Sequence, residues 1–486
     1  MAADKEVLRF NPSPTGHVHL GNMRTALFAW LWATHTGGEL QFRIEDTDQA
    51  RFVETAEDQI KQSLEWLGLT WTGPVIHQSE RVKDGVYLEY AKQLVENDWA
   101  YVADESPEEI AGIKEAQQAA IKAKQPLPPY PSKDKGISFS KFGPGKGMVI
   151  RFNWPDQPKP MEITYFDAAK PWKTAFDPKT APSAFEDFVL IKADGYPTYN
   201  FAHVIDDHDF GVTRVIRGDE FTSSLNKYVA LHEAFDWQPP QYNHVPPILG
   251  PDKAKLSKRH GAEDVLEYRD AGYLPMALAN FLVLIGWSPG GNRELFFSLD
   301  ELADAFTLDG IQKSPGVFDV EKLNWMNAEH LKQLDAGAVL ALAKEGGFWP
   351  AKETDDKDAA VIGLAMERSK TLKDVGAYRE SYFYHRPKLG QKQLVGDENP
   401  ENVGVWLERT QRQLEKLPEP DWQPDTLHDE LTDVLEEIGL KPKQLYPVLR
   451  EALTAEPHTP ALWDVMAALG QDESLARLEA AAALVA

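Results

Sequence analysis

The sequence predicts an α/β protein in which a parallel sheet is interrupted by an inserted segment and followed by helices. Three observations support this fold class: a strand, loop, helix and strand in succession near the N-terminus, a change to polar, Pro-rich sequence near residue 104, and helical periodicity from about residue 262. With 486 residues the chain is too long for one hydrophobic core, so we expect several domains.

The N-terminal segment reads as a βαβ unit, the repeating element of parallel sheets. Its parts are VLRF (7–10), NPSPTG (11–16), TALFAWLWA (25–33), the stop GG (37–38) and LQFRI (40–44). In the last part Leu40, Phe42 and Ile44 alternate with polar residues, as in a half-buried strand. The strand runs into EDTD, where the carboxyl edge of a parallel sheet would display ligand-binding groups.

The inserted segment starts with a helix signal. SPEE at 106–109 combines a capping box with Pro at the first helical position, and the polar helix should end in QPLPPYPS (125–132). FVLIK (188–192), a DG turn (194–195) and GVTRVIRG (211–218) then predict strands. The first fold therefore resumes after the insertion.

The last third of the chain is predicted to be helical. The segments with helical periodicity are LPMALANFLVLIGW (274–287), SLDELADAF (298–306), DVEKLNWMNAEHLKQL (319–334) and LARLEAAAAL (475–484). The Ala-rich end reads as a packed helix rather than a tail.

The composition excludes several classes of protein. No apolar run approaches the ~20 residues that a membrane helix needs. The N-terminus has no basic and apolar leader, and the chain has no cysteine for disulfides, so we expect a cytoplasmic protein. The absence of cysteine also excludes thiolate zinc sites and a cysteine nucleophile. A net charge of −25 argues against a nonspecific polyanion binder, but a local basic groove can coexist with remote acidic faces because salt screens them.

The loop NPSPTGHVHLGN (11–22) suits a triphosphate. A strand that enters a rigid Pro/Gly turn and then a helix places backbone N–H groups and the positive helix end at the edge of the sheet. His17 and His19 would stand beside the phosphates. The alternative is a tight turn whose histidines cap or pack.

A second motif concentrates positive charge in this acidic chain. KLSKRHG (255–261) places Lys255, Lys258 and Arg259 close together behind the turn residues GPDKA (250–254). Taken alone, such a cluster is usually a solvated basic loop.

Together the two motifs indicate a family. HLGN (19–22) and KLSKR (255–259) resemble the HIGH and KMSKS signatures of class I aminoacyl-tRNA synthetases in order and separation. Between them RIEDTD (43–48), DGYPTYNFAHVIDDH (194–208) and VIRGDE (215–220) resemble the bacterial glutamyl-tRNA synthetases. The resemblance covers essentially the whole chain, including WMN at 325–327, and is only architectural after about residue 380.

The resemblance implies a Rossmann-like doubly wound catalytic domain with an α/β insertion, followed by all-α stem-contact and anticodon-binding domains. The expected boundaries are 1–95 and 204–247 for the two halves of the catalytic domain, 96–203 for the inserted acceptor-binding domain, 248–330 for the stem-contact segment with the KLSKR loop, and 331–378 and 379–486 for two helical anticodon-binding domains.

The implied activity is ATP-dependent ligation of L-glutamate to the 3′ end of tRNA(Glu), with release of AMP and pyrophosphate. The expected partners are tRNA(Glu), L-glutamate and ATP with Mg²⁺, without zinc and without a membrane. No heptad or large apolar stripe forces association, so we expect a monomer.

The resemblance also implies site residues. The expected catalytic residues are His19, Lys255 and Lys258. The expected ATP-binding residues are Thr15, Gly16, His19, Gly21, Asn22, Glu220, Lys255, Ser257, Lys258 and Arg259. The expected glutamate-binding residues are Arg9, Ser13, Glu45, Tyr199, His203 and Arg217, and Arg368 is expected to contact tRNA.

The chemistry needs little acid–base catalysis, because the attacking carboxylate is already ionised. Catalysis is therefore mostly alignment plus neutralisation of charge on the leaving pyrophosphate, a task that Lys255 and Lys258 fit. A loop with flanking glycines could close over ATP and reopen.

Recognition of glutamate needs planar, forked donors for a carboxylate and an anion for the ammonium. The resemblance implies that Arg9, Tyr199 and Arg217 surround the side-chain carboxylate, with Ser13 and Glu45 near the ammonium. Both arginines lie in a predicted strand or at its end. The alternative for them is a structural salt bridge with Glu45, Asp46 or Asp219, and for Tyr199 it is packing.

The run HVIDDHDFG (203–211) contains ligand types for a metal: His203, Asp206, Asp207 and His208. We expect no ion there, because on a sheet edge the two aspartates would point opposite ways. Magnesium should arrive with ATP.

Two departures from the family pattern concern the signatures. Asn22 replaces the second His of HIGH, so it can donate to a phosphate but cannot be cationic, and KMSKS has become KLSKR.

Two C-terminal segments are candidates for reading the anticodon. MERSKTLK (366–373) and YRESYFYHRPK (378–388) offer Arg and aromatic planes on which bases can stack. The alternative is that these residues form a hydrophobic core with a solvated rim.

Three rivals stay open. A glutaminyl-tRNA synthetase would normally carry C-terminal β-barrels, and a shorter enzyme that charges a modified tRNA base with glutamate would lack an anticodon domain. A catalytically inactive tRNA-binding paralogue is disfavoured by the retained lysines and by Arg9, Glu45 and Arg217. The sequence leaves open whether tRNA(Gln) is charged as well.

Overall fold

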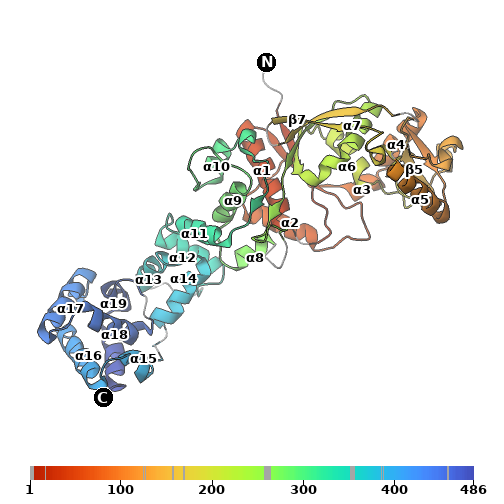
Figure 1. Cartoon of the computed structure of the whole chain (residues 1–486). Helices are drawn as coiled ribbons and strands as arrows, with labels where there is room; N and C mark the ends of the chain where they lie inside the picture. Colours follow the sequence, from red (N-terminus) through yellow and green to blue (C-terminus); the bar gives the residue numbers. More distant parts are fainter. Residues whose placement is uncertain are drawn as a thin grey trace. The chain divides into compact units, whose positions relative to one another are not determined.

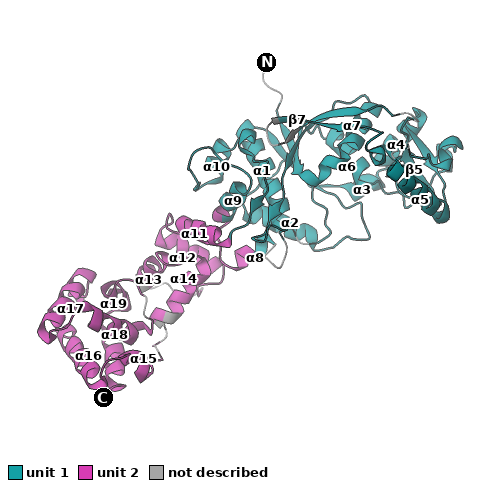
Figure 2. Ribbon diagram, in the orientation of Figure 1, with its two compact units in different colours: residues 1–267, 278–319 teal, residues 268–277, 320–486 magenta. Residues whose placement is uncertain are grey.

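The structure is a computed structural model that describes residues 5–16, 18–123, 125, 127–155, 158–167, 170–256, 264–350, 356–384, 386, 388–456 and 459–486. The chain forms two compact units, coloured separately in Figure 2. Unit 1 contains residues 1–267 and 278–319, and unit 2 contains residues 268–277 and 320–486.

Parallel strands form the centre of unit 1. β1 (Val7–Phe10) pairs with β2 (Glu39–Ile44), which pairs with β3 (Ile76–His77). The backbone amide of Thr213 donates to the Val7 carbonyl at 2.9 Å, which joins β1 to the start of β9 (Arg214–Gly218). The strands β2 and β3 thus lie on one side of β1, and β9 lies on the other. The strand order therefore reverses at β1, as in a doubly wound fold. The parallel sheet predicted from the sequence is confirmed.

Beyond β9 the sheet continues with strands from two parts of the chain. β10 (Gln241–Val245) pairs in parallel with β9 and with β6 (Met161–Asp167), and β7 (Lys170–Phe176) pairs antiparallel with β6. β11 (Ile248–Leu249) and β12 (Gly316–Val317) form a separate parallel pair. The strands β6 and β7, which fall within the predicted insertion, therefore extend the sheet of β9 and β10.

Helices flank these strands. In unit 1 they are α1 (Leu20–Thr36), α2 (Ala56–Trp66), α3 (Gln78–Lys83), α4 (Val86–Glu96), α5 (Pro107–Ala123), α6 (Tyr199–Asp209), α7 (Leu225–Ala234) and α10 (Leu299–Ala305). Both α8 (Val265–Asp270) and α9 (Pro275–Leu284) contain residues of each unit. Figure 1 shows α7 beside the β6–β7 hairpin, and α6 packs against α7.

The inserted segment contains its own antiparallel sheet, in the order β4 (Ala100–Ala103), β5 (Val149–Phe152), β8 (Val189–Ile191). The capping box predicted for α5 is confirmed: the Ser106 amide donates to Glu109 Oε2 at 2.7 Å, and the Glu109 amide donates to Ser106 Oγ at 3.2 Å. One hydrophobic cluster joins this sheet to α6 and α7. The residue boundaries of the domains stay predictions.

The stop predicted after the first helix is a left-handed cap. Gly37 has φ 64°, and its amide bonds back to the last turn of α1. A Cβ on Gly38 would lie 2.3 Å from the Glu6 carbonyl oxygen, which also accepts from the Glu39 amide at 2.8 Å. The backbone at Glu6 and the backbone at Gly38 therefore approach so closely that position 38 requires glycine.

Unit 2 is helical, as the periodicity predicts. Its helices are α11 (Val320–Leu331), α12 (Ala336–Glu345), α13 (Asp356–Met366), α14 (Leu372–Tyr378), the π-helix η7 (Arg379–Tyr384), α15 (Gln391–Val395), α16 (Pro400–Leu414), α17 (Pro424–Ile438), α18 (Pro442–Thr454), α19 (Leu462–Leu469) and α20 (Gln471–Ala483). Among the described residues after Val317 there is no strand. Within the described part of the chain, no helix combines the length and apolar character that crossing a bilayer requires.

Candidate active site

A pocket of about 380 Å³ lies at the carboxyl ends of β1, β9 and β10 in unit 1. This is the edge at which ligands bind in doubly wound sheets. The predicted site residues that line it are Arg9, Ser13, Thr15, His19, Gly21, Asn22, Glu45, Tyr199, Arg217, Glu220 and Lys255. The structure thus brings together residues that the sequence separates by up to about half the chain.

The loop after β1 is held by backbone hydrogen bonds. The Glu45 amide donates to the Pro12 carbonyl at 3.0 Å, and the Val53 amide donates to the Pro14 carbonyl at 2.9 Å. His19 is the N-cap residue of α1, but its side chain makes no capping hydrogen bond, and the first turn of the helix contains no acidic residue. Without a side-chain cap or an acidic residue in the first turn, the positive end of this helix favours an anion such as a phosphate.

Lys255 approaches the pocket from a tight turn. The Gly250 amide donates to the Ala254 carbonyl at 2.8 Å, the Lys253 amide donates back to Gly250, and Lys255 then pairs with Leu249. Lys255 is exposed and lines the pocket. His17, Ser257, Lys258 and Arg259 lie outside the described residues, and Gly16 is described but is not among the lining residues.

Arg217 is a buried cation whose terminal nitrogens lack partners. It is 4% exposed, and neither Nη1 nor Nη2 has a hydrogen-bond partner among the described residues. Its guanidinium carbon lies 4.7 Å from the ring centroid of Tyr228, 4.8 Å from that of Tyr242 and 5.3 Å from that of Phe221. The aromatic faces favour the cation but cannot neutralise it, so an anionic ligand would be strongly attracted.

Arg9, in contrast, has a carboxylate partner. Its Nε donates to Asp207 Oδ1 at 3.3 Å, while its Nη2 is buried without a partner in the described structure. Arg43 Nη2 donates to the same oxygen at 2.7 Å. The two guanidinium groups hold the pKa of Asp207 well below its usual range, although burial acts in the opposite direction. The alternative partners expected from the sequence are Glu45, Asp46 and Asp219, but the carboxylate that Arg9 contacts is that of Asp207.

Glu45, a residue of the pocket lining, uses one carboxylate oxygen within the protein and leaves the other without a partner among the described residues. Its Oε1 accepts from Asn11 Nδ2 at 2.6 Å and from Arg43 Nη2 at 3.5 Å, whereas Oε2 has no partner among the described residues. Burial raises the pKa of Glu45 to about 7, and the charge of Arg43, the hydrogen bond from Asn11 and the charge of Arg9 oppose that shift. An ammonium group would satisfy Oε2 and favour the ionised form.

Tyr199 and His203 form one stack on α6. Their rings lie 4.9 Å apart with an 8° interplanar angle, and Tyr199 lines the pocket. His203 Nδ1 bonds the Tyr199 carbonyl at 3.0 Å, and burial lowers the pKa of His203 well below its usual value. His203 is not among the lining residues, so its expected contact with glutamate stays a prediction.

One structural expectation is wrong. Asp206 and Asp207 do not lie on a sheet edge but on α6, where successive residues are rotated by about 100°. Asp206 accepts from Tyr87 OH at 2.9 Å and Gln78 Nε2 at 2.8 Å, and forms an ion pair with Arg81 Nε at 2.8 Å. Both carboxylates are thus engaged by arginines. Among the described residues no group of three metal-ligand side chains forms a site.

Several residues that shape the site were missed from the sequence. Arg43 lies in β2 between Phe42 and Ile44, on the strand face that the alternation of apolar and polar residues predicts to be polar. It is nevertheless 0% exposed, because Asp206 and Asp207 of α6 pair with it on that face. Arg24 in α1 lines the pocket and donates to the Ile285 carbonyl at 2.8 Å and to the Pro246 carbonyl. A lone arginine within an apolar run was the available signal for both.

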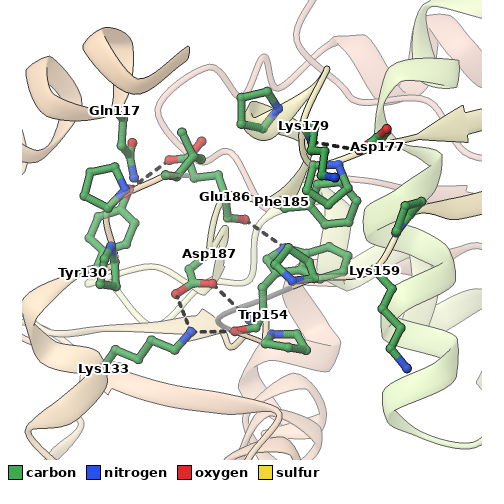
Figure 3. Close-up of a pocket in the computed structure, with 18 residues that line it drawn as sticks. Gln117, Tyr130, Lys133, Trp154, Lys159, Asp177, Lys179, Phe185, Glu186 and Asp187 are labelled. Atoms are coloured by element: carbon green, nitrogen blue, oxygen red, sulfur yellow. Dashed lines mark hydrogen bonds and ion pairs between the residues drawn. The ribbon is translucent and has the colours of Figure 1, made fainter. Parts of the chain in front are cut away.

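A larger cavity of about 650 Å³ lies in the inserted segment and has a different character (Figure 3). Lys133 Nζ donates to the Trp154 carbonyl at 2.6 Å, Tyr130 OH donates to Glu186 Oε1 at 2.9 Å, and the Trp154 ring N–H donates to the Glu186 carbonyl. No buried polar atom of its described lining side chains lacks a partner. The smaller pocket, with unpaired atoms on Arg9, Glu45 and Arg217, is therefore the better candidate for binding a charged substrate.

In unit 2, Arg368 is exposed between α13 and α14. Burial raises the pKa of Tyr378, and the charge of Arg368 opposes this shift, which places Arg368 near that ring. Tyr378 stacks on Tyr382 at 4.7 Å. Arg379, by contrast, is buried and pairs with Asp358 and Glu380, so part of the basic, aromatic segment is core.

Two sequence families match the chain. Residues 6–325 match "tRNA synthetases class I (E and Q), catalytic domain", and residues 326–482 match "Anticodon binding domain". The glutamate–tRNA ligase of Desulfosudis oleivorans is 38% identical over 490 residues, covering 99% of this chain and 98% of that protein.

Solved structures agree. A glutamate tRNA ligase from Elizabethkingia meningosepticum, in complex with its amino acid, is 30% identical with a TM-score of 0.85, covering 99% of this chain and 100% of that one. The glutamate–tRNA synthetase of Elizabethkingia anophelis is 31% identical with a TM-score of 0.81 over the same shares. Together with the pocket at the switch point of the sheet, these matches show that the chain belongs to the class I tRNA synthetases of the glutamate and glutamine group.

Proposed function

We propose that the protein is a glutamate–tRNA ligase, which activates L-glutamate with ATP and transfers it to the 3′ end of tRNA(Glu). The observation that carries the proposal is Arg217, a buried cation that has no acidic partner among the described residues and lies in the same pocket as the start of α1, which has no side-chain cap. One part of the pocket suits a carboxylate and the other a triphosphate.

The reaction proceeds in two balanced steps. An oxygen of the glutamate α-carboxylate attacks the α-phosphorus of ATP, the bond to the bridging oxygen breaks, and pyrophosphate leaves. The 3′-terminal ribose hydroxyl of tRNA then attacks the carbonyl carbon of glutamyl-adenylate, AMP leaves, and the hydroxyl proton is released. The first step needs no base, because the attacking carboxylate is already ionised, so positioning and charge neutralisation dominate that step.

The glutamate subsite follows from the unpaired atoms. The side-chain carboxylate accepts from Arg217 Nη1 and Nη2, with Arg9 Nη2 as a further donor, and the ammonium donates to Glu45 Oε2. Ser13 and Tyr199 line the same pocket. Arg217 therefore distinguishes glutamate from glutamine by charge.

The ATP subsite uses the start of α1 and the turn that carries Lys255. The α1 N–H groups and Asn22 donate to phosphate oxygens, His19 and Lys255 stabilise the charge that develops on pyrophosphate, and Thr15, Gly21 and Glu220 border the nucleotide. Gly16, Ser257, Lys258 and Arg259 complete this set by resemblance. Magnesium is part of the ATP substrate and keeps most of its water; we propose no zinc, a monomeric state and a cytoplasmic location.

The glutaminyl rival is disfavoured by unit 2. The described residues after Val317 form helices, whereas a glutaminyl-tRNA synthetase would normally carry β-barrels there. The whole-chain matches are to glutamate–tRNA ligases.

The test is glutamate-dependent exchange between ATP and pyrophosphate, with tRNA(Glu) present. We expect Arg217→Gln to raise the KM for glutamate at least tenfold and leave the KM for ATP within about twofold, because only the carboxylate loses its partner. Arg214→Gln is the matched control: Arg214 lies on the same strand, but it binds Glu6 and Asn243 and does not line the pocket. Equal KM values for glutamate in the Arg217 variant and the unaltered protein would refute the assignment.

A further inference from the structure

The two buried arginines of the glutamate subsite are held in different ways. Arg9 is bonded to the carboxylate of Asp207, which compensates its charge. Arg217 Nε instead donates to His244 Nε2 at 3.3 Å, and no carboxylate within ion-pair distance of Arg217 is recorded among the described residues. The second arginine is therefore oriented by an imidazole.

Strand pairing places this imidazole. His244 in β10 is the register partner of Arg217 in β9, so the two side chains lie on the same face of the sheet. His244 is 2% exposed, and its ring meets that of Tyr165 edge to face at 5.1 Å. The histidine is thus fixed behind the guanidinium rather than in the pocket, which it does not line.

The hydrogen bond determines the protonation state. A guanidinium can only donate, so His244 Nε2 must be the acceptor and carry no proton. The proton of the neutral ring is then on Nδ1, which is buried and has no partner among the described residues. Burial, and then the charge of Arg217, lower the pKa of His244 to about 3, in agreement with a neutral ring.

We propose that His244 is a positioning and specificity-determining residue: a neutral acceptor that orients the Arg217 guanidinium without cancelling its charge, and so reserves that charge for the side-chain carboxylate of the substrate. The inference rests on the proposed function. A carboxylate at position 244 would orient Arg217 equally well but would form an ion pair with it. The substrate carboxylate would then meet a compensated arginine.

Two nearly isosteric variants separate orientation from charge. His244→Gln supplies a neutral acceptor of similar reach, and His244→Glu supplies a charged one. We expect the KM for glutamate to stay within about threefold for the Gln variant and to rise at least tenfold for the Glu variant, with the KM for ATP and kcat nearly unchanged in both. The preference for glutamate over glutamine, measured as the ratio of kcat/KM values, should fall at least tenfold only in the Glu variant.

Asn243→Asp is the matched control for added charge. Asn243 precedes His244 in β10 and accepts from buried Arg214 Nη1 at 2.8 Å, so the variant also places a carboxylate against a buried arginine of β9. Because that pair does not line the pocket, we expect an unchanged KM for glutamate. Thermal unfolding of all three variants shows whether each is folded.

The outcomes are distinguishable. If the Gln and Glu variants lose glutamate affinity equally, His244 is only structural and the proposal is overturned; unaltered kinetics in the Glu variant also overturn it while the proposed function stands. If the unaltered protein shows no glutamate-dependent exchange, the function and the inference both fail. Should the Glu variant not fold, selective ¹⁵N-histidine NMR of the unaltered protein decides: a neutral ring protonated on Nδ1 supports the proposal, and an imidazolium at pH 7 contradicts it.

Discussion

At the scale of single residues, the site is defined by which buried charges are satisfied. Arg43 is surrounded by Asp207, Asp206 and Glu45, and these carboxylates raise its pKa even though burial lowers it. In the part of the chain that the structure describes, Arg217 has no such partner. Since an unpaired buried charge is costly, its persistence in the fold indicates a ligand that supplies the missing anion.

Glu45 predicts a pH dependence of glutamate binding. Burial raises its pKa to about 7, and only the ionised carboxylate can pair with the substrate ammonium. Binding should therefore strengthen as pH rises through 7, with a dissociation constant about tenfold higher at pH 6 than at pH 8. Calorimetry of glutamate binding at the two pH values, with tRNA(Glu) present and ATP absent, measures this.

The same raised pKa has a consequence without ligand. The protonated form stabilises the folded state, so the contribution of Glu45 is present below its ordinary value of 4.5 and is lost as pH rises through about 7. In Glu45→Gln, the pH dependence of glutamate binding and the part of the pH dependence of the free energy of unfolding that is due to Glu45 should both disappear. A tenfold change in glutamate affinity that persists in this variant would assign the titration to another group.

At the scale of elements, the turn after β1 and the start of α1 build the nucleotide end of the site. A Cβ on Gly21 would meet no atom within 4 Å, so its glycine is not required by packing. Gly21 nevertheless lines the pocket at the first turn of α1. The space above it is therefore available to a ligand that approaches the backbone.

Gly21→Ala should separate binding from folding. We expect the KM for ATP to rise about tenfold, because the added methyl group occupies the approach to the helix N-terminus, while the melting temperature stays the same or rises, since Ala favours helix. Gly363→Ala in α13 is the control: a Cβ there also meets no atom, and the position is remote in sequence from the nucleotide loop. A Gly21 variant with normal KM for ATP would remove α1 from the ATP subsite.

Elements with a local signal could be predicted from the sequence. The βαβ unit, the capping box of Ser106 and the helical last third depend on periodicity and on residues within one turn. The assignment of Asp206 and Asp207 failed because helix α6 is defined by packing, which the local pattern does not reveal. Arg43 and Asp207 are 164 residues apart, so no local pattern could pair them.

The site also divides into residues that local motifs predict and residues that depend on contacts between distant segments. Motifs placed Arg9, Glu45 and Arg217 in one pocket, as the structure has them. His244 lies outside every motif, and its role depends on the pairing of β9 with β10. Cross-strand partners of this kind need the register of the sheet, which the sequence alone does not supply.

At the scale of the whole molecule, a chain with net charge −25 binds a polyanion by local recognition. Unit 1 provides the positively charged pocket, and unit 2 carries the match to the anticodon binding domain over most of its length. Arg368, near the stacked rings of Tyr378 and Tyr382, offers a planar cation for an unpaired base.

Arg368→Gln should weaken tRNA(Glu) binding about tenfold, the scale of one base contact, and leave the KM values for glutamate and ATP unchanged. Arg412→Gln is the matched control, since Arg412 is an exposed arginine of α16 that pairs within its own helix. Filter binding at fixed salt compares the two variants. Equal tRNA affinity for both would place anticodon recognition elsewhere in unit 2.

The central claim is tested most directly by charging purified tRNA with labelled amino acid. With ATP and magnesium, the protein should attach labelled glutamate to tRNA(Glu), and neither glutamine nor aspartate should be attached at a comparable rate. Parallel reactions with tRNA(Gln) show whether that tRNA is a second substrate. Failure to charge any tRNA with glutamate, or faster charging with glutamine, would contradict the account.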